Sequence, residues 1–163
     1  LYNVKPDIMG CGKAAGGGIL PVSFVASRDD IIGTLTPGSE GSTFGGYPLA
    51  SVVGVYAIKT LVDEKLSEKA LLRGKQLMDG LNSIKHDFSD KIKIVRGKGL
   101  LTAFEMYDSP NLDGHHISVE LMNNGIYAKE THHTTIRLAP ALTINQEQIN
   151  NLLDGIRNVI KKL

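Results

Sequence analysis

One lysine stands among residues that are almost without side chains, in the stretch GCGKAAGGG from Gly10 to Gly18. A lysine nucleophile must be a free amine part of the time, although the unperturbed pKa of its ammonium group is ~10.4. Surroundings that exclude water and carboxylates disfavour the ammonium form, and no acidic residue lies between Asp7 and Asp29. Lys13 is therefore a candidate for Schiff-base chemistry with a flat cofactor, which the small neighbours would allow close to the backbone.

Two other interpretations of this lysine need to be considered. A phosphate-binding loop of the Walker type requires a glycine five residues before the Gly-Lys pair and a Ser or Thr after it. Asp7 and Ala14 occupy those two positions, so the Walker interpretation fails at both ends. A surface lysine in a flexible glycine loop is compatible with the composition and stays open on the residues alone.

A second glycine-rich stretch, GSEGSTFGGYP, offers two neighbouring hydroxyls at Ser42 and Thr43. Glycines at 41, 45 and 46 would expose backbone N–H groups around them. Such groups form an anion-binding nest that suits a cofactor phosphate. An ordinary turn-rich connection is the alternative interpretation.

The composition narrows the class of protein. The 163 residues are 42% hydrophobic and 21% charged, which is typical of a globular chain. Eighteen Lys and Arg against 17 Asp and Glu leave a formal charge of +1, so we expect no nucleic-acid and no membrane partner. The single cysteine, Cys11, excludes an internal disulfide framework and fits a reducing compartment. The longest apolar window, Leu49 to Val62, is too short to span a bilayer.

Two histidine pairs, His115-His116 and His132-His133, are candidates for metal ligands. Adjacent histidines in an extended chain point to opposite faces, and neither pair has a Cys or acidic cluster beside it. We therefore assign no metal.

The hydrophobic pattern predicts strands and helices in an α/β arrangement. A buried strand is expected at 19–26, a buried helix at 49–62, and a second helix with Ser67 as its N-cap. The pattern then predicts a small unit of strand, helix, strand, strand and helix, with a domain boundary in the polar stretch 85–90. Its expected elements are two strands around the turn 97–99, a helix at 115–125 closed by Gly125, strands at 126–130 and 135–140, and a last helix that begins with a capping box of Asn145 and Gln148.

Four stretches together resemble the class III, or omega-type, aminotransferases, which use pyridoxal 5'-phosphate (PLP). They are, in order, KPDIMGCGKAAGGGILPVS, GSTFGGYP, RGKGLLTAFE and TIRLAPALTI, and the resemblance covers essentially the whole chain. Within the class, LYNVKPDI, GSTFGGYPLA and IRLAPAL are most similar to the ornithine aminotransferases. The resemblance implies the C-terminal part of a fold-type I PLP-dependent transferase. Residues 1–88 would end the PLP-binding large domain, and residues 89–163 would form the C-terminal small α/β domain.

The resemblance also implies site residues. Lys13 falls on the catalytic position that carries PLP, and Ser42 and Thr43 fall on the pair that contacts its phosphate. In these dimers that loop reaches the cofactor of the other subunit. Arg137 falls on the arginine that meets a substrate carboxylate, a role that suits a bidentate and permanently charged group. A surface ion pair is the alternative for Arg137, and Arg96 is expected to be structural, tying its turn to the large domain.

The implied function is PLP-dependent transfer of an amino group from an omega-amino donor, with ornithine preferred, to 2-oxoglutarate. The implied assembly is a homodimer with shared active sites, and the implied compartment is the cytoplasm, with the mitochondrial matrix as the alternative. An acetylornithine or 4-aminobutyrate aminotransferase is the alternative within the class. The alternative of another kind is a non-catalytic C-terminal fragment or subunit that is inactive alone.

Some residues depart from the family pattern. Gly10, Cys11 and Gly12, with Ala14 and Ala15, stand where ornithine enzymes more typically carry bulkier leucines and a serine, and Tyr47 replaces an asparagine. These departures put the fine substrate specificity in doubt, not the PLP chemistry. The family's acid for the pyridine nitrogen, its aromatic ring stacker and its first phosphate loop would lie upstream of Leu1. We therefore expect this chain to be the C-terminal two-fifths or so of a longer enzyme.

Overall fold

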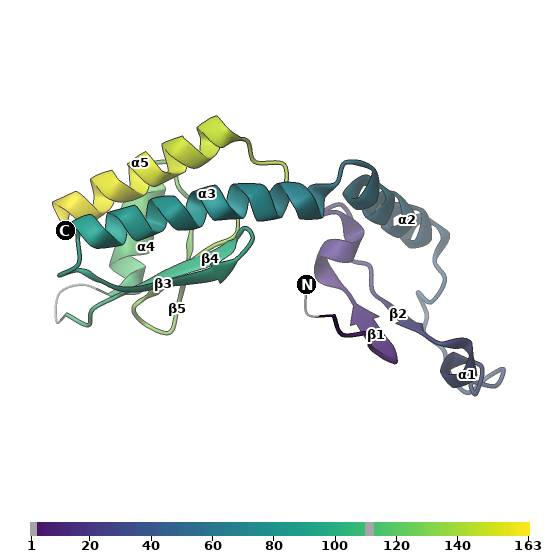
Figure 1. The fold of residues 1–163 in the computed structure, drawn as a ribbon. Coiled ribbons are helices and arrows are strands. Elements are labelled where there is room, and N and C mark those ends of the chain that lie inside the picture. The colour runs from purple at the N-terminus through teal and green to yellow at the C-terminus, as the bar shows by residue number, and fades with distance from the viewer. Residues whose placement is uncertain (1–2, 110–112) are drawn as a thin grey trace. The chain divides into compact units, whose positions relative to one another are not determined.

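The computed structural model describes residues 3–109 and 113–163, and it contains both helices and strands, as the sequence predicts. The chain divides into two compact units, Leu1–Lys65 and Leu66–Leu163. Each unit has its own antiparallel sheet, and Figure 1 shows their elements.

The first unit is built on a two-stranded sheet in which Ile8 pairs with Ser27 and Cys11 with Phe24. A short 3₁₀ helix follows the first strand. The elements are β1 (Ile8–Cys11), η1 (Lys13–Gly16), β2 (Phe24–Ser27), α1 (Asp29–Ile32) and α2 (Pro48–Asp63).

Small residues allow η1 and the segment between η1 and β2, which contains Val22, to pack closely against α2. Gly16 and Gly54 are buried, and a Cβ built at Gly54 would lie 3.2 Å from Cγ1 of Val22. Since that distance is tighter than ordinary van der Waals contact, a side chain at position 54 would require Val22 to move by a few tenths of an ångström.

The second unit is a four-stranded antiparallel sheet with helices packed on one face (Figure 1). The strand order is β3-β4-β6-β5. The elements are α3 (Leu66–Asp87), β3 (Ile92–Lys98), β4 (Leu101–Met106), α4 (Gly114–Asn123), β5 (Lys129–Thr131), β6 (Thr135–Leu138) and α5 (Gln146–Lys162).

The hydrophobic core of the second unit lies between the sheet and its helices. Phe104 and Ile136 are registered opposite each other on β4 and β6, and both are fully buried. Full burial of such a side chain contributes about 1.5–3 kcal/mol, so this core is the main stabilising element of the unit. Its other members are Leu77, Leu81, Ile84, Ile92, Leu100, Met106, Ile117, Leu121, Leu138, Ile149, Ile156, Val159 and Ile160.

The predicted helix ends of the second unit are confirmed. Gly125 follows α4 with a left-handed φ of 78°, and its N–H donates to the carbonyl of Met122 while that of Ile126 donates to Leu121. At the start of α5, Asn145 Oδ1 accepts from the Gln148 N–H and Gln148 Oε1 accepts from the Asn145 N–H, both at 2.9 Å. Both motifs satisfy backbone groups that a helix leaves without an internal partner.

Two predictions for the first unit need correction. The expected buried strand at 19–26 is shorter, spans Phe24–Ser27 and is largely exposed, with Val25 at 58%. The expected helix at 49–62 exists as α2, but among its described residues only Gly54 is buried. The helix is apolar on most faces, whereas η1 and its neighbours cover one narrow strip of it.

The start of α3 also differs from the prediction. Lys65 has a left-handed φ of 51°, and the helix begins at Leu66, so Ser67 lies in the first turn and not at the N-cap. The apolar face of α3 packs on β3 and α5, which places this helix in the second unit. The polar stretch at 85–90 covers the end of α3 and the turn after it. The domain boundary expected there lies one helix further along the chain than the division at Lys65. The large- and small-domain assignment of residues 1–88 and 89–163 stays a prediction.

Within the described residues, no helix has the length and apolar character needed to cross a membrane.

Leu77→Ala should lower the free energy of unfolding of the second unit by about 2–5 kcal/mol, because it leaves a cavity in a packed core. Leu72→Ala is the matched control, since it makes the same truncation in α3 at a side chain that is 61% exposed. Urea titrations followed by far-UV circular dichroism measure both variants. Equal losses for the two variants would contradict the assignment of the buried face.

Candidate functional site

Lys13 begins η1 in a backbone conformation that is unusual for a residue with a side chain. Its φ is 54°, in the left-handed region, and Gly17 closes the same turn with a φ of 61°. Left-handed geometry costs a non-glycine residue roughly 1–2 kcal/mol and is often found at functional sites. The Lys13 side chain is exposed and makes no hydrogen bond or ion pair with any described residue.

The nearest acid in the sequence is engaged elsewhere. Asp7 pairs with Arg28, and Arg28 Nε also donates to Asp30 at 2.9 Å. Hydrogen bonding to Arg28 lowers the pKa of the Asp30 carboxyl, so this carboxylate stays charged and paired to more acidic pH. Arg28 thus holds two carboxylates together, at the end of the β1–β2 ladder that is farther from Lys13.

The loop that carries Ser42 and Thr43 is a pair of tight turns. The N–H of Gly45 donates to the carbonyl of Ser42 at 3.0 Å, and that of Tyr47 donates to Phe44 at 3.1 Å. Two of the backbone donors expected in an anion nest are therefore used inside the loop. The hydroxyls of Ser42 and Thr43 are exposed and have no protein partner among the described residues, so they are open to a ligand.

An apolar hollow of about 840 Å³ lies beside this loop, within the first unit. Ser42, Phe44 and Tyr47 line it together with the segment before β2 and the apolar side of α2. Lys13 and Thr43 are not among its lining residues. The hollow therefore does not join the two halves of the predicted PLP site.

Arg137 lies on β6, on the side of the sheet opposite the core. Its neighbours Ile136 and Leu138 are buried at 0% and 3%, whereas Arg137 is exposed. This alternation confirms the predicted strand and places Arg137 on the face opposite its two buried neighbours. Among the described residues no acid pairs with Arg137, which lines an open cavity of about 380 Å³ with Arg96, Thr131 and Thr135.

Arg96 bonds within its own sheet. Its Nη1 donates to Glu105 Oε2 at 2.8 Å, and Lys93 Nζ donates to Glu105 Oε1 at 2.9 Å. These hydrogen bonds, that of Arg96 above all, lower the pKa of the Glu105 carboxyl. The sequence analysis expected Arg96 to tie its turn to the large domain. The contact observed in the structure is instead an ion pair with Glu105 on the neighbouring strand β4.

Neither histidine pair lies in extended chain, which was the conformation considered for both pairs in the sequence analysis. His115 and His116 are in the first turn of α4, and His132 and His133 form the β5–β6 turn with left-handed φ values of 51° and 64°. Nδ1 of His115 lies 3.4 Å from Oε2 of Glu130. In the part of the chain that the structure describes, no three His, Cys, Asp or Glu side chains are grouped to hold a metal ion.

Sequence reasoning missed the two carboxylates that the neighbouring arginines bind, Asp7 and Glu105. Alternation along β4 was a usable signal for Glu105, because it places Glu105 on the same face as Ala103. No comparable signal pairs Asp7 with Arg28, which lie 21 residues apart and meet across the β1–β2 hairpin.

Comparison with known proteins assigns the chain to a family. A family model described as Aminotransferase class-III matches residues 1–160, and the chain belongs to this family. The ornithine aminotransferase of Arabidopsis thaliana mitochondria is 39% identical over 161 residues, which are 97% of this chain and 34% of that protein. The acetylornithine aminotransferase of Elizabethkingia anophelis superposes with a TM-score of 0.93 at 40% identity, over 99% of this chain and 40% of that one.

A third relative is a structure whose description names the cofactor PLP. An ornithine aminotransferase structure from Toxoplasma gondii, described as having partial occupancy of PLP at its active site, superposes with a TM-score of 0.91 at 38% identity. It matches 98% of this chain and 37% of its own. These matches confirm the predicted α/β class as part of a fold-type I PLP-dependent aminotransferase fold. The chain spans little more than a third of the Arabidopsis relative.

Proposed function

We propose that this chain is part of a PLP-dependent aminotransferase that moves the δ-amino group of ornithine to 2-oxoglutarate. The observation that carries the proposal is Lys13, an exposed lysine without an acidic partner among the described residues, in a glycine-rich turn of a class III aminotransferase chain.

The residues around Lys13 fit the cofactor. The turn has Gly12 on one side of Lys13 and Ala14 on the other, so little side-chain bulk would obstruct a flat ring. Lys13 Nζ would hold PLP, and the Ser42 and Thr43 hydroxyls would bind its phosphate. Once bound, PLP draws electrons from the substrate carbon that bears the amine. Lys13 Nζ, when free, would take the proton from that carbon and pass it to the cofactor.

Arg137 would bind a carboxylate of the 2-oxo acid or of the amino donor. Arg137 is exposed on the open face of the sheet, and no acid pairs with it among the described residues. A planar guanidinium binds a carboxylate through two parallel hydrogen bonds, which fixes the orientation of the substrate.

The second candidate donor is N-acetylornithine. The superposition on the Elizabethkingia acetylornithine aminotransferase favours it, and the small residues around Lys13 would leave room for an acylated substrate. 4-Aminobutyrate is the third donor. Parallel assays of the three donors with 2-oxoglutarate distinguish them.

The proposed assembly is a homodimer in which each phosphate loop serves the neighbouring subunit. The exposed apolar side chains of α2 support this, since Val55, Tyr56 and Val62 are each more than 60% exposed. Large exposed apolar patches typically mark interaction surfaces. We expect the enzyme in the cytoplasm, with the mitochondrial matrix as the alternative because the Arabidopsis relative is a mitochondrial protein by name.

Borohydride reduction of the complete enzyme with PLP should leave a pyridoxyl label on Lys13, because reduction makes the bond to Nζ permanent. Peptide mapping by mass spectrometry locates the label. Lys13→Ala should abolish it, and Lys5→Ala, eight residues earlier, is the matched control that should retain it. A pyridoxyl label on a different lysine would contradict the assignment of Lys13. The absence of any label on a PLP-loaded enzyme would also contradict it, and both results would favour a non-catalytic chain.

Mixed dimers should show whether sites are shared. A Lys13→Ala chain paired with a Ser42→Ala/Thr43→Ala chain would place both defects in one site and leave the other intact. Activity above the sum of the two parents is then expected, measured after separation of tagged mixed dimers. Proven mixed dimers with no such gain would mean that each loop serves its own subunit.

Arg137→Lys should weaken substrate binding by about 5- to 150-fold, the equivalent of ~1–3 kcal/mol, because a point charge replaces a bidentate group. The pyridoxyl label on Lys13 should be unaffected. Arg157→Lys is the control, because Arg157 is a surface residue ion-paired with Asp87. Half-reaction kinetics with 2-oxoglutarate and with the amino donor give both affinities. Unchanged affinities would make Arg137 structural.

A further inference from the structure

Arg96 and Arg137 occupy equivalent positions on the two sides of the central strand β4. Ala103 is registered opposite Arg96 on β3 and opposite Arg137 on β6. Registered partners in an antiparallel sheet point to the same face, so both guanidinium groups belong to the face opposite the core. Glu105, two residues along β4, shares that face and is a diagonal neighbour of both arginines. Diagonal neighbours have Cα atoms roughly 7–8 Å apart, within reach of long side chains.

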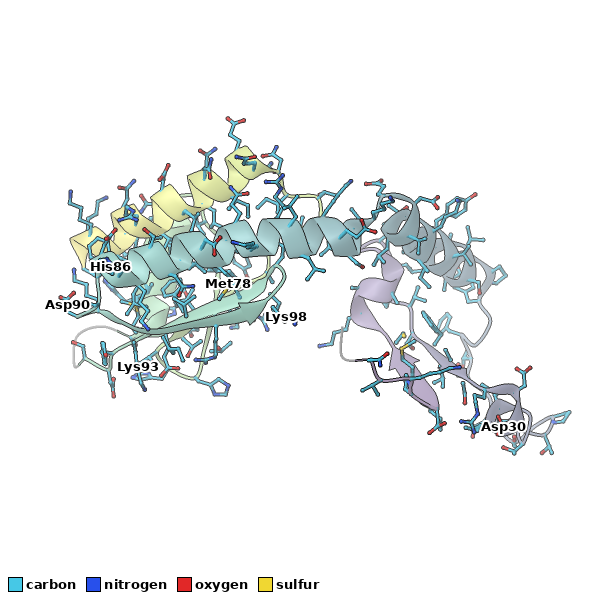
Figure 2. All side chains as sticks on the ribbon, in the orientation of Figure 1. Asp30, Met78, His86, Asp90, Lys93 and Lys98 are labelled. Atoms are coloured by element: carbon cyan, nitrogen blue, oxygen red, sulfur yellow. The ribbon has the colours of Figure 1, made fainter. Side chains whose placement is uncertain are left out.

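Glu105 uses both of its oxygens on the β3 side. Oε2 accepts from Arg96 and Oε1 accepts from Lys93, and the Glu105 side chain is only 20% exposed. A register shift between Ile92 and Ile94 re-aims this part of β3, and Figure 2 shows Lys93 on the side of the strand away from α3. Both oxygens of the Glu105 carboxylate are therefore bonded to cations of β3, and the carboxylate does not pair with Arg137.

Glu105 is also the acid that could compete for Arg137 within the sheet. The strands that the structure describes contain two acidic residues, Glu105 and Glu130. Glu130 is registered opposite Ile136, whose side chain is in the core, so Glu130 belongs to the other face. Glu105 is therefore the acidic residue of these strands that shares a face with Arg137.

We propose that Arg96, assisted by Lys93, is a positioning residue that holds Glu105 on the β3 side and so leaves Arg137 open to a substrate carboxylate. This rests on the proposed role of Arg137. Without Arg96, Oε2 of Glu105 is released and pairs with Arg137 across the other diagonal. Glu105 then competes with the substrate, and Arg96 influences binding without touching it.

The test uses the complete enzyme and glutarate, an unreactive dicarboxylate of the same length as the acceptor, with its dissociation constant measured by calorimetry. Arg96→Gln should weaken glutarate binding by about 2- to 5-fold, the range expected when a part-exposed ion pair must be broken. The KM for 2-oxoglutarate should rise in parallel, and kcat should change little. Arg96→Lys, which keeps the charge, should bind glutarate nearly as the unaltered enzyme does.

Glu105→Gln in the Arg96→Gln background is the decisive variant, because it removes the competitor and should restore glutarate affinity. A merely structural role of Arg96 would not give this rescue. Unchanged affinity in Arg96→Gln, or a double variant that stays weak, overturns the proposal. If Arg96→Gln does not fold, Lys93→Gln carries the test. It should weaken binding to a smaller extent, reversed by Glu105→Gln, and an unweakened or unrescued Lys93→Gln overturns the proposal in the same way.

Arg137→Lys separates this inference from the proposed function. If Arg137→Lys leaves glutarate binding unchanged, Arg137 is not the carboxylate site and the proposed function fails. If Arg137→Lys weakens binding but Arg96→Gln does not, only the positioning role of Arg96 fails.

Discussion

Burial of one face of the four-stranded sheet is the constraint on which the second unit depends. Phe104, Ile136 and Leu138 are held in the core by α3, α4 and α5, and the residues between them must then face the other way. Because side chains along a strand alternate, a register slip of one residue would exchange the two faces completely. Such a slip would bury Arg137 and expose Ile136, at a large cost in free energy. Hydrophobic packing on the far side of the sheet therefore decides that Arg137 is open to a ligand.

The first unit depends on its backbone more than on a core. Small residues allow η1 and the segment before β2 to lie against α2, and Lys13 and Gly17 both have left-handed φ values. A lysine in this conformation is strained, and strain of that kind persists only where the surrounding chain imposes it. The rest of α2 is apolar and exposed, so the unit has surface that its described residues do not cover.

In each unit an arginine binds an acidic side chain. Arg28 pairs with Asp7 in the first unit, and Arg96 pairs with Glu105 in the second. Only Glu105 shares a sheet face with a candidate site residue, Arg137, because Asp7 and Lys13 lie at opposite ends of β1. Lys13 and Arg137 have no acidic partner among the described residues, as a nucleophilic amine and a carboxylate-binding guanidinium both require.

Local patterns in the sequence were enough to predict the α/β class, the family resemblance, the β3–β4 hairpin, the β6 strand that carries Arg137, and the Gly125 and Asn145 helix ends. These features depend on residues close together in the chain, where spacing alone dictates which groups meet. The packing of α3 with the second unit, the exposure of α2, the left-handed Lys13 and the ion pair of Glu105 with Arg96 could not be predicted in this way. They depend on which distant segments approach one another, and that is settled by the summed burial of many side chains and not by any single local pattern.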